Sequence, residues 1–131
     1  MHRIIVSFLI VALFFIQSSI VSAASKKTSG GGSVSTSAQL IKKRNAVRTY
    51  FGNLKGVKSV SYTLFYQANG VGQGVEGTFS PGKKKSWSKD LYLGTCSGKV
   101  CVAHRNIKNI QMEVKTKFTN GKTSTKLIKI K

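Results

Sequence analysis

The strongest constraint on the fold is a strict alternation of side chains near the C-terminus. The apolar or threonine residues stand at even positions: Ile110, Met112, Val114, Thr116 and Phe118. Glutamine, glutamate and lysine occupy the odd positions between them. Successive side chains of a strand point to opposite faces of a sheet, so this pattern predicts a strand with one buried and one wet face.

The dipeptide Asn120-Gly121 follows and is a strong hairpin signal. The returning segment carries Ile128 and Ile130. A two-residue loop would turn both isoleucines to the wet face, whereas a three-residue loop returns them to the core side. We therefore predict a three-residue loop with Gly121 left-handed, closed by a bulge, and Leu127 facing outward.

The same period of two recurs upstream. One face of a strand is predicted to carry Val60, Tyr62, Leu64 and Tyr66, with Phe65 outward. Residues 71–79 place apolar side chains at odd positions between glycines, which suits an edge strand or a bulge. Trp87, Leu91 and Leu93 line one face of the next strand. With turn signals every eight to twelve residues, we expect a single all-β domain over residues 46–131, a seven-stranded β-sandwich.

The N-terminal third is expected to lie outside this domain. Residues 1–23 have the basic, apolar and small-residue regions of a cleaved export signal, and an uncleaved membrane anchor is the alternative. After cleavage no transmembrane segment would remain. Residues 24–45 are small, polar and basic, and are predicted to form a flexible tether. A helix over residues 40–54 is possible, but the β-branched and aromatic residues of 46–51 favour a first strand.

Two apolar segments, residues 91–93 and 100–102, flank a Ser-Gly turn signal, and both cysteines, Cys96 and Cys101, lie in this stretch. Two cysteines in an exported chain predict a disulfide, here stapling two strands near their ends. The enclosed loop is short, so its entropic contribution would be about 2 kcal/mol. A structural zinc site needs four ligands, and these cysteines with His104 supply three at most.

The charge balance is extreme: 22 lysines and arginines stand against 3 acids, a net charge of +19. Such a charge favours anionic partners, although a lysine-rich solvated surface is the simpler explanation. The alternation places four lysines on one face of the last hairpin: Lys115, Lys117, Lys129 and Lys131. A basic turn adds Lys83, Lys84 and Lys85. We take these seven as candidate polyanion-binding residues, able to contact nucleic acid only without sequence preference.

The sequence offers few residue patterns that indicate catalysis. The glycines at 72, 74 and 77 match a dinucleotide fingerprint, but the sequence after them does not favour the helix that the fingerprint needs. His104 with Asp90 and a serine could form a triad, yet no G-x-S-x-G elbow accompanies them. We expect no catalytic activity, no cofactor and no metal site, and expect His104 to pack at a strand end beside the disulfide.

Three segments together carry a resemblance: residues 60–66, the Gly-Thr-Cys-Ser…Val-Cys…His pattern of 94–104, and residues 109–130. They resemble small secreted bacterial proteins of unassigned function with an immunoglobulin- or fibronectin-III-like domain. The resemblance implies a β-sandwich but no activity. The chain departs from true immunoglobulin domains because its two cysteines are too close in sequence to bridge two sheets.

These observations favour a secreted, non-catalytic binding or adhesion module that contacts anionic polymers or cell-surface partners. The alternative is a secreted cationic effector that acts on foreign membranes or nucleic acid. A hydrolase that uses His104 is a third, weaker interpretation.

Overall fold

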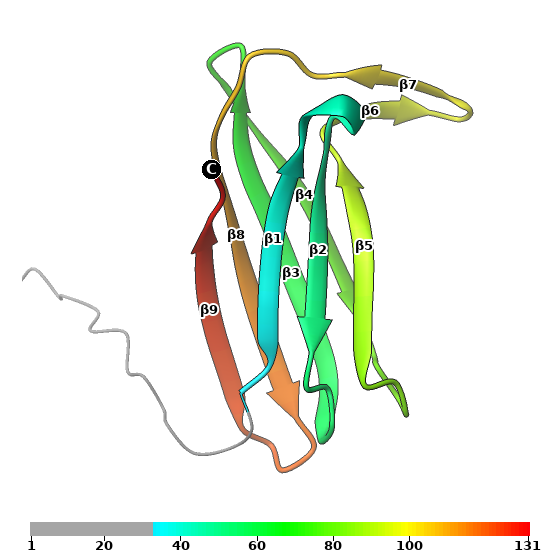
Figure 1. Ribbon diagram of the computed structural model, residues 1–131, viewed down its shortest axis with the longest axis vertical. Helices are drawn as coiled ribbons and strands as arrows, with labels where there is room; N and C mark the ends of the chain where they lie inside the picture. Colours follow the sequence, from blue (N-terminus) through cyan, green and yellow to red (C-terminus); the bar gives the residue numbers. More distant parts are fainter. Residues whose placement is uncertain (1–32) are drawn as a thin grey trace, which may run out of the picture.

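The computed structural model describes residues 33–131, which form two antiparallel sheets and one projecting hairpin (Figure 1). The first sheet has the order β1-β2-β5, with β1 at Ser35–Ile41, β2 at Ala46–Gly52 and β5 at Ser86–Tyr92. The second has the order β4-β3-β8-β9, with β4 at Val71–Phe79, β3 at Val57–Ala68, β8 at Ile107–Phe118 and β9 at Thr123–Lys129. The hairpin consists of β6 (Gly94–Ser97) and β7 (Val100–Ala103).

The all-β class is confirmed, but the described residues form nine strands rather than the seven expected. The domain also begins earlier than predicted, because residues 35–41 of the expected tether form β1 and pair with β2. Only alternate side chains of an edge strand face inward, so Ala38 and Leu40 suffice to pack β1 on the core. The rest of that tether before residue 33, and the whole export signal, lie outside the described residues.

The predicted first strand at 46–51 is confirmed as β2. The alternative helix over 40–54 is not formed. Instead a single 3-10 turn, η1 (Lys42–Arg44), connects β1 to β2, and Asn45 ends it in the left-handed conformation, with φ 48°. Asparagine adopts this conformation more readily than most residues, so the chain reverses there.

An aromatic cluster joins the two sheets. Phe51 of β2 is fully buried, with its ring centroid 6.1 Å from that of Tyr62, 5.4 Å from Phe79 and 5.6 Å from Trp87. Phe79 and Trp87 stack with centroids 4.1 Å apart. Such ring contacts add to the stabilisation from apolar burial, so this end of the sandwich is firmly packed. The remaining fully buried large residues include Leu54, Leu64, Leu93 and Met112.

The final hairpin has the predicted register. Met112 pairs with Ile128 and Lys117 with Thr123, so even residues face even residues and odd face odd across a three-residue loop. Gly121 has φ 80°, and its N–H donates to the Phe118 carbonyl, while the Phe118 N–H donates to the Lys122 carbonyl. This is the bonding of a turn followed by a bulge. Ile130 is buried and Leu127 is exposed, as expected.

Candidate functional site

Three loops gather at one end of the sandwich, opposite the β6–β7 hairpin (Figure 1). They are residues 53–56 between β2 and β3, residues 80–85 between β4 and β5, and residues 119–122 between β8 and β9. The first loop holds the other two by backbone hydrogen bonds. The Leu54 N–H donates to the Lys85 carbonyl at 3.2 Å, and the Thr119 N–H donates to the Gly56 carbonyl at 2.9 Å.

These loops carry five exposed lysines, which we call the basic pole: Lys55, Lys83, Lys84, Lys85 and Lys122. No carboxylate belongs to any of the three loops. The chain's acids are all on strands: Glu76 on β4, Asp90 on β5 and Glu113 on β8. Because hydrogen bonds join the loop backbones, all five lysines are held at this end of the molecule, where the fields of their charges add.

Asp90 is engaged by arginines near the opposite end of β5. Its carboxylate oxygens lie 2.8 Å from Arg48 Nε and 3.2 Å from Arg44 Nη1. The hydrogen bond from Arg48 is the largest cause that holds the pKa of the Asp90 carboxyl below its ordinary value. The basic cluster on η1 is therefore partly neutralised, whereas the basic pole has no acid on its own loops.

The structure divides the lysines expected to form one site. Lys83, Lys84 and Lys85 belong to the basic pole, and Lys117 stands at the adjoining end of β8. Lys115 pairs with Ser61 one step further from the pole, on the same outer sheet face.

Lys129 is separated from that group. It pairs with Gln111, whereas Glu113 lies between Gln111 and Lys115 along β8. Thr63 is paired with both Glu76 and Glu113, so a row with two carboxylates crosses the face at this point. Lys131 follows the end of β9, further still from the pole. Lys115, Lys117 and Lys129 therefore share the predicted outer face, but an acidic row separates Lys129 from the other two.

Sequence reasoning missed Lys55 and Lys122. Both lie in turn segments that the sequence marks, near Asn53 and Gly56 and beside Asn120-Gly121. Left-handed Asn53 and Gly56 show why those residue types are suited to the first loop. A turn signal locates a loop in the chain, but only the strand order reveals which loops meet.

The disulfide between Cys96 and Cys101 is present, and the two residues are directly opposed in the β6–β7 pair, with Cα atoms 4.0 Å apart. The disulfide is near the tip of the hairpin, whereas His104 follows the end of β7 at its base, so the expected position of His104 directly beside the disulfide is not found. The Nδ1 of His104 is 2.9 Å from the Tyr66 hydroxyl and its Nε2 is 3.0 Å from the Thr95 hydroxyl. Burial raises the pKa of the Tyr66 phenol. These contacts give the ring a positioning role, and Asp90, bound to its arginines, is not among its hydrogen-bond partners.

Other chemistry finds little support in residues 33–131. The glycines of the fingerprint-like motif lie within β4, and no helix follows them. Over the same range, no cluster of three or more histidine, cysteine or acidic side chains could hold a metal ion. No helix there is long and apolar enough to cross a membrane.

Comparison of this chain with protein-family models, with curated proteins and with solved structures finds no match.

Proposed function

We propose that this protein is a non-catalytic binding module for anionic polymers and that the basic pole is its contact surface. The observation that carries the proposal is the set of five lysines on three loops that contain no carboxylate, the first loop being hydrogen-bonded to each of the other two. Lys117 and Lys115 extend this surface along the outer face of the four-stranded sheet.

The physical basis is release of counterions. A polymer with regularly spaced negative charges holds a layer of condensed cations, and lysines that replace them free those cations into solution. Loops tied together at Leu54 and Thr119 present their lysines without first having to be ordered, so less conformational entropy is lost on binding. The pole lies on loops and its lysines are exposed, so an extended polymer suits it better than a small ligand.

We place the module outside the cell. The Cys96–Cys101 disulfide fits an oxidising compartment, and the expected export signal would deliver the chain there. The strand order, β1-β2-β5 against β4-β3-β8-β9, supports grouping the domain with immunoglobulin- and fibronectin-III-like sandwiches. Sandwiches of this kind serve many functions, so the functional proposal depends on the lysines alone.

The test compares two triple variants of equal charge. Lys83→Gln, Lys84→Gln and Lys85→Gln alter the pole, whereas Lys42→Gln, Lys43→Gln and Lys108→Gln remove three exposed lysines from the opposite end. Binding of single-stranded DNA and of heparin is measured from low to physiological salt. Loss of three phosphate contacts should flatten the log–log salt slope for the DNA by about 2.

The control triple should change that slope much less, and thermal unfolding of both variants should match the parent chain. Equal flattening by the two triples would mean diffuse attraction without a site. Absence of binding to both polymers at low salt would overturn the proposal.

A further inference from the structure

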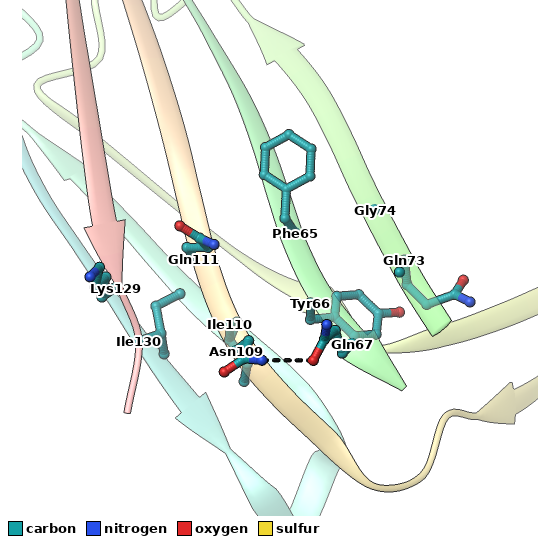
Figure 2. A pocket seen from close by; sticks show the side chains of 11 residues that line it. Phe65, Tyr66, Gln67, Gln73, Gly74, Asn109, Ile110, Gln111, Lys129 and Ile130 are labelled. Atoms are coloured by element: carbon teal, nitrogen blue, oxygen red, sulfur yellow. Dashed lines mark hydrogen bonds between the residues drawn. The ribbon is translucent and has the colours of Figure 1, made fainter. Parts of the chain in front are cut away.

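A hollow of about 860 Å³ opens on the outer face of the four-stranded sheet, at the end away from the basic pole. Figure 2 shows the side chains that line it. Its lining comes from β3, β4, β8 and the end of β9. Phe65 stands in it on β3 with 47% of its surface exposed, although Leu64 and Tyr66 on either side are buried. An exposed ring within a hollow differs from a single apolar residue on a flat surface, because a ligand can contact the ring and the walls together.

Two glycines leave the space beside the ring open. Gly74 pairs with Phe65 and Gly72 pairs with Gln67 on the edge strand β4. Neither has a positive φ, so the backbone does not require glycine at either position. A Cβ on Gly72 would meet nothing within 4 Å, and one on Gly74 would only contact the Leu64 carbonyl at 3.8 Å. Packing therefore does not require glycine at either position, and the space over this part of β4 is open to a ligand.

A bulge shapes the opposite wall. The pairing of β3 with β8 shifts by one residue beyond Phe65, and Asn109 takes the left-handed conformation there with φ 53°. Its amide nitrogen donates to Gln67 Oε1 at 2.6 Å (Figure 2). Each amide thereby keeps one polar group for a ligand: the Asn109 carbonyl oxygen and the Gln67 amide nitrogen. Bulges often reorient a side chain next to a binding site.

The polar groups identify the kind of ligand. Further along the sheet, Gln111 adds a third amide, and Gln73 of β4 is the fourth in the lining. Lys129 adds the hollow's one cationic side chain. Amides both donate and accept hydrogen bonds, as a ring of sugar hydroxyls requires, whereas a run of phosphates would need several cations. The apolar C–H face of a pyranose packs on an aromatic ring. The hollow falls in the usual size range for small-ligand sites, about 300–1,000 Å³.

We infer that this hollow binds a sugar unit of a polysaccharide, with Phe65 beneath the pyranose ring, the amides of Gln67, Asn109 and Gln111 on its hydroxyls, and Lys129 on the carboxylate of a uronic acid. The site is separate from the basic pole and goes beyond the proposed function. A polymer that occupied both would be an acidic polysaccharide.

The test uses the full chain on an array of neutral and uronic-acid oligosaccharides, followed by calorimetric titration of those that bind. Phe65→Ala and Gly74→Val, which fills the gap, should each weaken binding about tenfold, the loss expected for one well-packed contact. Lys129→Gln should weaken only the uronic-acid ligands. Leu127→Ala is the matched control, because Leu127 is 58% exposed on the same sheet but does not line the hollow.

The pole triple at Lys83, Lys84 and Lys85 should leave binding of neutral oligosaccharides unchanged, so the two proposals fail independently. Absence of any binder on the array would overturn the inference. So would affinities that survive both Phe65→Ala and Gly74→Val, or a dependence on Phe65 found for single-stranded DNA and not for any sugar.

Discussion

The sandwich and the β6–β7 hairpin are built from the same kind of strand but are stabilised differently. In the sandwich, Phe51 and Leu64 are fully buried between two sheets. In the hairpin, every residue of β7 is exposed, with Val100 at 68% and Val102 at 64%. Its two strands pair only with each other. An isolated two-stranded hairpin is marginal in water, so the disulfide replaces the burial that this hairpin lacks.

The two regions meet at the base of the hairpin. The Asn45 side-chain amide donates to the Leu93 carbonyl and, at 3.3 Å, to the His104 carbonyl. The His104 N–H donates to the Leu93 carbonyl at 2.9 Å, and its ring is held between Tyr66 and Thr95. The hairpin is therefore fixed at its base and free along its length, and its unfolding should be separable from that of the sandwich.

The largest effect should come from removing a ring at the centre of the sandwich. Phe51→Ala leaves a cavity among Tyr62, Phe79 and Trp87 and should lower the free energy of unfolding by about 3–5 kcal/mol. Denaturant titration measures this loss. Phe65→Ala is the matched control, because that ring is half exposed and should cost roughly 1 kcal/mol or less. Equal losses would show that the aromatic cluster is not the centre of stability.

Breaking the disulfide should affect the hairpin alone. With Cys96→Ser and Cys101→Ser together, we expect the hairpin to lose about 2 kcal/mol. Amide hydrogen exchange should speed up in residues 95–102 and stay slow at Leu64 and Val114. The whole-domain unfolding midpoint should scarcely move. A midpoint that fell as far as the local protection would mean that hairpin and sandwich unfold as one unit.

A pair of substitutions at Asn45 tests the connection at the base. Asn45→Ala loses the side-chain hydrogen bonds and strains a backbone with φ 48°, so it should cost about 1–2 kcal/mol. Asn45→Gly loses only the hydrogen bonds and should cost less, because glycine tolerates that conformation. Thermal unfolding with hydrogen exchange at the hairpin reports both. If Asn45→Gly lowered stability more than Asn45→Ala, the left-handed backbone of Asn45 would not contribute to fixing the base of the hairpin.

The smallest expected effect is a loss of folding stability at alkaline pH. Burial raises the pKa of Tyr62 and Tyr66 above the ordinary value of 10.0. The folded state therefore favours the neutral phenols, and their contribution is complete below pH 10.0 and is lost as the pH rises through the folded-state pKa. Tyrosinate absorbance should rise together with unfolding. Tyr62→Phe with Tyr66→Phe should reduce this alkaline loss, and an unchanged profile would assign it to other groups.

Local sequence patterns predicted the features that one hairpin determines by itself, but not those that depend on neighbouring strands. The alternation in β8 and the position of Gly121 were enough to derive the β8–β9 register, because one buried face allows only one parity. The β1 strand was missed because Ser35–Ile41 is largely small and polar, and its order depends on pairing with β2. The presence of two cysteines in a chain expected to be exported predicted the disulfide, but not that its hairpin would project from the sandwich.

The candidate site was only partly predictable for the same reason. Strand parity correctly puts Lys115 and Lys117 on the outer face, but the acidic row before Lys129 depends on how β3 pairs with β4 and β8. The basic pole forms because three loops far apart in the chain end at the same side of the sandwich. The periodicity of the sequence cannot show that these loops lie together, because the strand order determines it.

The most direct test of the central claim is a map of where a polyanion binds. A short single-stranded DNA, which carries phosphates but no uronic acid, is titrated into the isotope-labelled full chain at low salt, and backbone amide shifts are followed by NMR. The account predicts that the shifts cluster in residues 53–56, 80–85 and 119–122, with the amides of the β6–β7 hairpin unchanged. Shifts spread evenly over all the lysines, or centred on Lys42–Arg44, would contradict it.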